Sequence, residues 1–153
     1  MKTTKSKEYK SYINKISLVK EPSLIKNVKI TSSTDAYNYC KQFYFGDLEI
    51  YESMFLLLLN SANNTTGYAK ISQGGISGTV LDIKIILKYA LESLASGIIL
   101  CHNHPSGNTE PSEADKKITN KLKEACKLME ITLLDHVIIT KENFTSFADE
   151  GLM

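Results

Sequence analysis

Met54–Leu59 (MFLLLL) is the longest unbroken apolar run in the chain, and it constrains the fold more than any other feature. Its six residues are too few to cross a membrane, which takes about 20. Tyr51–Leu59 as a whole is typical of a β-strand buried on both faces along most of its length. Asn60–Gly67 is typical of a turn, after which Tyr68–Ser72 is predicted to return as the partner strand of a hairpin. The sequence therefore predicts a sheet whose central part is covered on both faces.

The rest of the chain alternates helical and extended patterns. Asp82–Ser96 and Ser112–Glu130 have the spacing of amphipathic helices, and a shorter helix capped by Ser33 or Thr34 is predicted to run to about Phe43. Further strands are predicted at Ile98–His102, Ile131–Thr140 and Phe144–Phe147. The expected core-facing residues of the three helices are Ala36, Tyr37, Cys40 and Tyr44; Ile83, Ile86, Leu87, Ala90, Leu91 and Leu94; and Ile118, Leu122, Ala125 and Met129. This order predicts an α/β fold in which helices sandwich a mixed β-sheet.

Charge is distributed unevenly along the 153 residues. Residues 1–30 contain eight lysines and two glutamates, whereas residues 31–153 contain ten lysines and fifteen carboxylates. We therefore expect a lysine-rich N-terminal arm, residues 1–30, which could contain an edge strand at Ile16–Lys20, followed by one domain, residues 31–153. The chain has no arginine, the usual bidentate reader of guanine and phosphate, so we expect at most weak, non-specific DNA binding.

The N-terminus and the cysteines predict where the chain resides. MKTTKSKEYK and the residues after it lack the apolar stretch of about 7–15 residues that a signal peptide needs. Cys40, Cys101 and Cys126 are odd in number and scattered, so we expect no disulfide framework and a reducing compartment. The prediction is a cytoplasmic protein with no membrane partner, in which the three thiols are small apolar core residues.

The segment Cys101–Asp115 (CHNHPSGNTEPSEAD) contains the side chains that indicate chemistry. His102 and His104 are two residues apart, so both imidazoles point to the same side of an extended strand, which Pro105 ends. By its spacing, Asp115 lies on the core-facing side of the following helix, where a carboxylate needs a charge or hydrogen-bond donors. Two histidines and one carboxylate, with a fourth position for water, are typical of a catalytic zinc site.

The same residues also have structural explanations. His102 and His104 could be two unrelated, hydrogen-bonded histidines. Ser112-Glu113-Ala114-Asp115 matches a helix capping box with aspartate in place of the usual glutamate. Ser112 is predicted to be a helix N-cap in either case.

The pattern H-x-H-P, six residues, S-x-x-D resembles the metal signature of the JAMM/MPN+ metallopeptidases, also called the JAB domain. HNHPSG followed by PSEAD resembles its bacterial RadC-type branch, and the resemblance extends to residues 74–80, 133–136 and 147–152. It implies an MPN/JAMM-like fold with a cytidine-deaminase-like core over residues 31–153. It also implies one zinc ion per chain held by His102, His104 and Asp115, a catalytic glutamate at Glu52, and Ser112 as a donor to the developing oxyanion.

Glu52 suits the role of general base because its strand parity matches Met54, Leu56 and Leu58, at the end of one buried face. A glutamate beside a metal-activated water can accept its proton and return it to a leaving amine. Glu49 is the nearest competitor, with the opposite parity if the strand extends that far back. Without the resemblance, the residues favour an ordinary solvated strand-end carboxylate at Glu52.

His136 is predicted to be a packed or hydrogen-bonded structural histidine rather than support for a metal ligand. The glycines at 74, 75 and 78 are predicted to form a flexible loop, against which an extended substrate could lie. HExxH is absent, and so is the CxxC that a nucleobase deaminase requires.

These observations predict a zinc-dependent hydrolase that cleaves a peptide or isopeptide bond in a peptide or protein substrate. The alternative is a non-catalytic RadC-like domain with a scaffolding or DNA-repair-associated role. The longer RadC-type proteins carry an N-terminal helical domain suited to DNA contact, for which we expect this chain to have no room.

Overall fold

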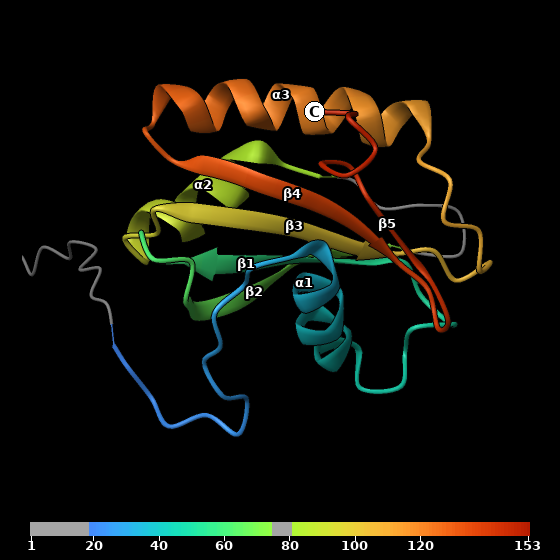
Figure 1. Ribbon diagram of the computed structural model, residues 1–153, viewed down its shortest axis with the longest axis horizontal. Helices are drawn as coiled ribbons and strands as arrows, with labels where there is room; N and C mark the ends of the chain where they lie inside the picture. The colour runs from blue at the N-terminus through green and yellow to red at the C-terminus, as the bar shows by residue number, and fades with distance from the viewer. Residues whose placement is uncertain (1–18, 75–80) are drawn as a thin grey trace, which may run out of the picture.

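The computed structural model describes residues 19–74 and 81–153, which are built around one five-stranded sheet (Figure 1). In chain order, its strands are β1 (Ser53–Leu59), β2 (Thr65–Gln73), β3 (Gly97–Asn103), β4 (Thr132–Ile139) and β5 (Phe144–Ser146). Their order across the sheet is β2-β1-β3-β4-β5. β3 and β4 are parallel and the other neighbours are antiparallel, so the sheet is mixed, as predicted.

The predicted hairpin is confirmed, with shifted ends. β1 begins at Ser53 rather than Tyr51, because the backbone N–H of Tyr51 is already bonded to Asp47 in the preceding turn. β2 begins at Thr65 rather than Tyr68, because the left-handed conformation of Asn63 (φ +59°) closes the connection early. Thr65 can therefore pair with Leu59 at the very end of β1.

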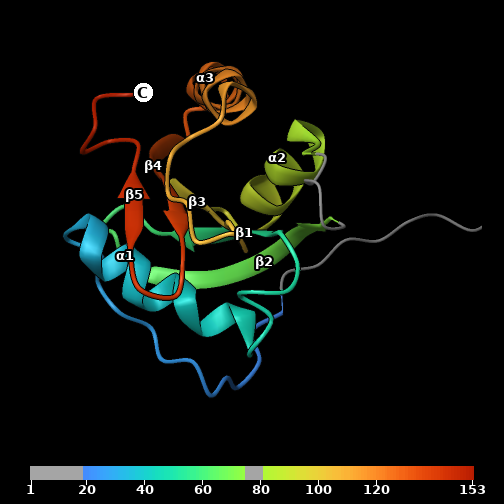
Figure 2. The ribbon, with the colours of Figure 1, turned by 90° about the vertical axis from the view of Figure 1, so that its right-hand side faces the viewer.

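Helices cover both faces of the sheet, as Figures 1 and 2 show. α1 (Ser33–Cys40) and the 3-10 helix η1 (Lys41–Tyr44) lie on one face, and α2 (Ile83–Glu92) and α3 (Glu113–Leu128) lie on the other. The alternation of β1 explains why its apolar run is continuous: Phe55, Leu57 and Leu59 pack toward α1, whereas Met54, Leu56 and Leu58 pack toward α2 and α3. The predicted fold class, a mixed sheet sandwiched by helices as in MPN/JAMM domains, is confirmed.

The connection from β3 to β4 positions the candidate site. Parallel neighbours cannot be joined by a tight turn, so the chain leaves the end of β3, crosses over through α3 and returns into β4. This crossover brings the first turn of α3 beside the last residues of β3.

The helix starts follow the capping chemistry of the sequence. Ser112 caps α3 as predicted, and Asp82 caps α2. The cap of α1 is Ser32 rather than Ser33 or Thr34, because only Ser32 forms the reciprocal capping box with Asp35.

Some residues predicted to be buried are exposed. Leu91, in the last turn of α2, is 45% exposed. Leu94 is 80% exposed, because α2 ends at Glu92 and the left-handed φ of Leu94 (+54°) directs the chain away. Met129 is 43% exposed, beyond the end of α3. In that helix the buried residues are Thr119, Leu122 and Cys126, while the predicted Ile118 and Ala125 are half-buried at the edges of the stripe. In α1, Tyr37 is half-buried against Phe144, and Tyr39 is buried in its place.

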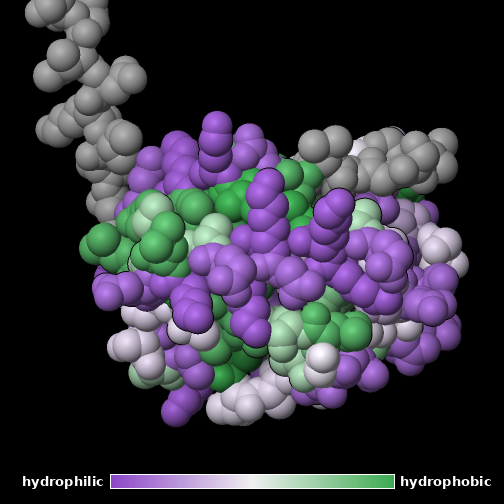
Figure 3. All heavy atoms as spheres, turned by 90° about the horizontal axis from the view of Figure 1, so that it is seen from above, coloured by the Kyte–Doolittle hydropathy of each residue, from purple (hydrophilic) through white to green (hydrophobic). Residues whose placement is uncertain are grey.

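The three cysteines are free and buried, as predicted. Among the helices of residues 19–74 and 81–153, none is long and apolar enough to span a membrane. Of the predicted edge strand Ile16–Lys20, residues 16–18 lie outside the described residues, and Val19 and Lys20 are not in a strand. The outer face of the molecule over α3 is largely hydrophilic (Figure 3), since Lys117, Lys121, Lys123 and Glu124 are exposed there.

Candidate metal centre

His102 and His104 stand at the end of β3. His102 shares the parity of Ile98 and Leu100 and therefore points to the face covered by α2 and α3, where it is fully buried. His104 follows the last strand residue, and its backbone N–H still bonds to Ile139 of β4, which keeps the extended course that directs its ring to the same side. The side chain of His104 is 16% exposed.

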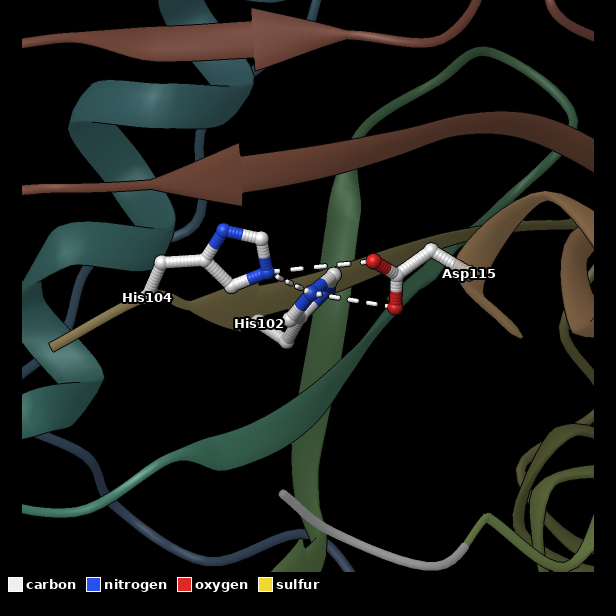
Figure 4. A group of neighbouring side chains, drawn as sticks. All are labelled: His102, His104 and Asp115. Atoms are coloured by element: carbon white, nitrogen blue, oxygen red, sulfur yellow. Dashed lines mark hydrogen bonds and ion pairs between the residues drawn. The ribbon is translucent and has the colours of Figure 1, made fainter. Parts of the chain in front are cut away.

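Asp115 comes from the first turn of α3 and faces both rings (Figure 4). Its Oδ1 lies 3.4 Å from Nε2 of His102, and its Oδ2 lies 3.8 Å from Nε2 of His104. The two Nε2 atoms are 3.0 Å apart. One potential ligand atom from each of the three residues lies within 4.8 Å of the other two, and within the described part of the chain this is the one group of this kind.

Ser112 forms the predicted cap and also orients the Asp115 carboxylate. Its backbone N–H and its hydroxyl donate to Oδ2 of Asp115 at 2.8 and 2.6 Å, while its Oγ accepts from the Asp115 backbone N–H. The capping box therefore fixes one carboxylate oxygen and leaves Oδ1 directed at His102. A capping box and a ligand assignment for Asp115 are compatible, because the cap uses Oδ2 while Oδ1 faces His102.

The loop after β3 determines which ring nitrogen of His104 carries the proton. Nδ1 of His104 lies 2.7 Å from the backbone carbonyl of Asn108, which can only accept, so Nδ1 carries the ring proton. In the neutral ring this leaves a lone pair on Nε2, the atom that faces Asp115. Gly107, with φ +81°, makes the turn that brings the Asn108 carbonyl back to the ring.

Burial favours neutral rings at this site. Desolvation lowers the pKa of His102 to about 4; Asp115 raises it and His104 lowers it further. The pKa of His136 lies well below its usual value, first because of burial and then because of the neighbouring His102 and His104. Neutral imidazole is the form of histidine that binds metals. The donor set of two imidazoles and one carboxylate therefore fits a zinc ion.

A cleft of about 760 Å³ opens beside these residues. Its walls come from the segment before β1 and from the segment between β3 and α3. They consist of Glu49, Ile50, Glu52, His104, Pro105, Ser106, Asn108, Glu110 and Ser112. Glu52 is half-buried and directly precedes β1, where its backbone carbonyl accepts from Gly74. The structure thus brings Glu52 and Ser112 to one cleft with His104, and their catalytic roles stay predictions.

The condition for a parity difference between Glu49 and Glu52, a strand that extends back to Glu49, is not met. β1 begins at Ser53, so Glu49 lies in a turn, where it forms an exposed ion pair with Lys141 at 3.2 Å and lines the same cleft. Of the three predicted loop glycines, Gly74 donates its backbone N–H to the carbonyl of Glu52. Gly75 and Gly78 lie outside the described residues.

His136 lies directly behind His102. Its Nε2 is 2.8 Å from Nδ1 of His102, and its Nδ1 is 2.6 Å from the hydroxyl of Thr119. It is hydrogen-bonded, as predicted, but its partner is a candidate metal ligand rather than unrelated structure. The contact of Thr119 with His136 was not predicted from the sequence, although the position of Thr119 one turn after Asp115 could have indicated that it lies near the site.

No role was predicted from the sequence for Asn103 either. It lies between the two histidines and points to the opposite face of β3, where it is fully buried. Its Oδ1 accepts from the backbone N–H of Ser53, and its Nδ2 donates to the carbonyls of Leu48 and Tyr51. These partners flank Glu52, so Asn103 fastens the segment that carries Glu52 to the strand that leads into both histidines.

A mixed sheet between helices, with a His-x-His pair at the end of one strand and an aspartate in the first turn of the next helix, defines the class as a JAB-type domain with an MPN-like fold. The family model of the RadC-like JAB domain matches residues 30–152. The chain therefore belongs to the RadC-like JAB domain family, and the resemblance seen in the sequence is confirmed. The JAB superfamily includes metallohydrolases.

Similar proteins bear the name UPF0758 protein. That of Flavobacterium johnsoniae is 45% identical over 129 residues, covering 84% of this chain and 56% of the relative. Those of Chlorobium phaeovibrioides and Porphyromonas gingivalis are each 42% identical over 125 residues, covering 82% and 81% of this chain and 55% and 54% of the relatives. The chain thus spans about half the length of these curated relatives.

Proposed function

We propose that this chain is a zinc-dependent hydrolase that cleaves a peptide or isopeptide bond in a peptide or protein substrate. The observation that carries the proposal is the convergence of His102, His104 and Asp115 within 4.8 Å, beside a cleft lined by Glu52 and Ser112. Membership of a superfamily that includes metallohydrolases supports it. The free thiols of the three buried cysteines support a reducing compartment, the cytoplasm.

In this proposal, Nε2 of His102, Nε2 of His104 and the Asp115 carboxylate hold one zinc ion per chain. When bound, the ion supplies Lewis-acid chemistry, lowering the pKa of a water molecule and polarising the scissile carbonyl. The protein contributes fixed donors, since Ser112 holds the carboxylate and the Asn108 carbonyl holds the His104 ring.

Glu52 acts as the general base. Its carboxylate accepts the proton of the attacking water and delivers that proton to the amine nitrogen as the C–N bond breaks. The half-buried position of Glu52 on the cleft supports this role. Ser112 stabilises the developing oxyanion by redirecting its hydroxyl from Oδ2 of Asp115 to the substrate oxygen, while its backbone N–H stays bonded to Oδ2.

Metal analysis combined with a cleavage assay tests the proposal. Purified protein should contain one zinc ion per chain, and His104→Ala should contain far less, because one of three ligands is lost. A proteome-derived peptide library and an isopeptide-linked substrate set should be cleaved by the native protein, and a chelator should abolish the cleavage.

Two results would contradict the proposal. Equal zinc in wild type and His104→Ala would refute the ligand assignment. A zinc-loaded protein that cleaves neither substrate set would instead favour the alternative, a non-catalytic scaffolding or DNA-repair-associated domain. DNA binding that survives physiological salt would strengthen that alternative, because the lysine-rich residues 1–30 should give only weak, salt-sensitive binding.

A further inference from the structure

A chain of three hydrogen bonds runs behind the candidate metal centre and joins two of its ligands. Nδ1 of His102 is 2.8 Å from Nε2 of His136, whose Nδ1 is 2.6 Å from Oγ1 of Thr119. The Thr119 hydroxyl is in turn 2.6 Å from the backbone carbonyl of Asp115. His102, His136 and Thr119 are fully buried, so these polar atoms depend on one another for hydrogen bonds.

The last contact determines the direction of all three bonds. A backbone carbonyl can only accept, so the single proton of the Thr119 hydroxyl is donated to Asp115. Oγ1 of Thr119 must then accept from His136, which places the His136 ring proton on Nδ1. Among the described residues, the ring nitrogens of His136 contact a hydroxyl and another imidazole, neither of them acidic, so the buried ring has one proton, on Nδ1, and a lone pair on Nε2. His102 therefore donates from Nδ1 and presents an unprotonated Nε2.

We propose that Thr119 and His136 are positioning residues that hold His102 in the one tautomer able to bind a metal through Nε2. The inference rests on the proposed function, because it assumes that a metal occupies the His102, His104 and Asp115 group. His104 is fixed in the same tautomer by the Asn108 carbonyl. Two independent backbone carbonyls thus direct both Nε2 lone pairs to the same point.

This arrangement makes the group selective for a cation. The two Nε2 atoms are 3.0 Å apart, and the Asp115 oxygens are 3.4 and 3.8 Å away. With both ring protons on Nδ1, no proton lies between the two nitrogens, so their contact is repulsive in the absence of a positive charge. If His102 were in the other tautomer, its Nε2–H would donate to His104 and the cluster would be satisfied without metal. The Thr119–His136 chain excludes that alternative.

The tautomers can be measured directly on the metal-free chain of 153 residues. Two-bond ¹H–¹⁵N NMR spectra of the histidine rings should show His102, His104 and His136 all protonated on Nδ1. Thr119→Val, which keeps the shape of the side chain but removes the hydroxyl, should give His102 a mixture of tautomers. Thr119→Ser, which retains the hydroxyl, should restore the wild-type spectrum.

Zinc affinity, measured with zinc alone against a chromophoric chelator, provides the second readout. Loss of a hydrogen-bond partner behind a ligating histidine typically weakens metal binding by about 10–100-fold, and we expect that loss for Thr119→Val. Thr119→Ser should stay within about threefold of wild type. His102→Ala, which removes the ligand itself, sets the lower limit.

The outcomes separate this inference from the proposed function. Wild-type His102 protonated on Nε2 overturns the inference without any variant, so the test does not depend on the folding of Thr119→Val. Equal zinc affinity of wild type and Thr119→Val overturns the inference and leaves the metal site intact. A wild type that binds no zinc overturns the metal site, and with it the role assigned to Thr119 and His136.

Discussion

Replacing Asn103 by alanine should destabilise the protein while leaving zinc bound. The change removes a fully buried side chain and three hydrogen bonds, at 2.7 Å to Ser53, 2.6 Å to Leu48 and 2.8 Å to Tyr51. At about 0.5–1.5 kcal/mol for each bond, the loss is about 1.5–4.5 kcal/mol. Because the N–H of buried Ser53 loses its partner, we expect the upper half of that range, about 3–4.5 kcal/mol. That is a large part of a typical folding free energy of about 5–15 kcal/mol.

Urea unfolding of the metal-free protein measures this loss. Asn120→Ala, on the exposed side of α3, is the control and should change the unfolding free energy by no more than about 0.5 kcal/mol. Zinc content of Asn103→Ala should equal that of wild type, because Asn103 points away from the His102 and His104 rings. If Asn103→Ala unfolds at the same urea concentration as wild type, the three hydrogen bonds do not fasten the Glu52 segment and this reasoning is refuted.

Three further predictions concern the site. Glu52→Gln should retain zinc and lose hydrolysis by about 10²–10⁴-fold, whereas Glu49→Gln, a control on the same cleft, should retain activity; loss of zinc from Glu52→Gln would instead make Glu52 a ligand. Ser112→Ala should lose about 1 kcal/mol of stability with its cap and about 10²–10³-fold in rate. A lower melting temperature combined with full turnover would leave Ser112 as a cap only. The metal-free protein should lose stability as the pH falls from about 6.5 toward 4. The pKa of His102 is 6.5 in the unfolded chain and about 4 in the folded protein, so the unfolded state takes up the proton first. A urea midpoint that does not change across this range would contradict the burial of a neutral ring.

The sequence predicted the elements of the fold well because their signals are local. The apolar run of β1, the capping box at Ser112 and the alternation of His102 and His104 each depend on a few neighbouring residues. The burial errors at Leu94 and Met129 arose where a helix ended earlier than its apolar pattern, through backbone conformations that composition does not reveal.

The supporting residues of the site could not be predicted in the same way. Thr119 and His136 are 17 residues apart and meet only because α3 packs across β4. Asn103 reaches Leu48 across 55 residues because β1 and β3 pair in one particular register. Such contacts depend on tertiary structure, and a threonine, a histidine or an asparagine at these positions has no periodicity that marks it.

The alternation of three consecutive residues explains how the two halves of the site are held together. His102 and His104 point to one side of the chain at the end of β3, toward Asp115, while Asn103 points to the other side and holds the backbone on either side of Glu52. The imidazoles and the Glu52 segment are therefore attached to the same end of β3. Asn103, the middle residue of the His-x-His pattern, is not a proposed metal ligand, but it links the proposed ligands to the proposed general base.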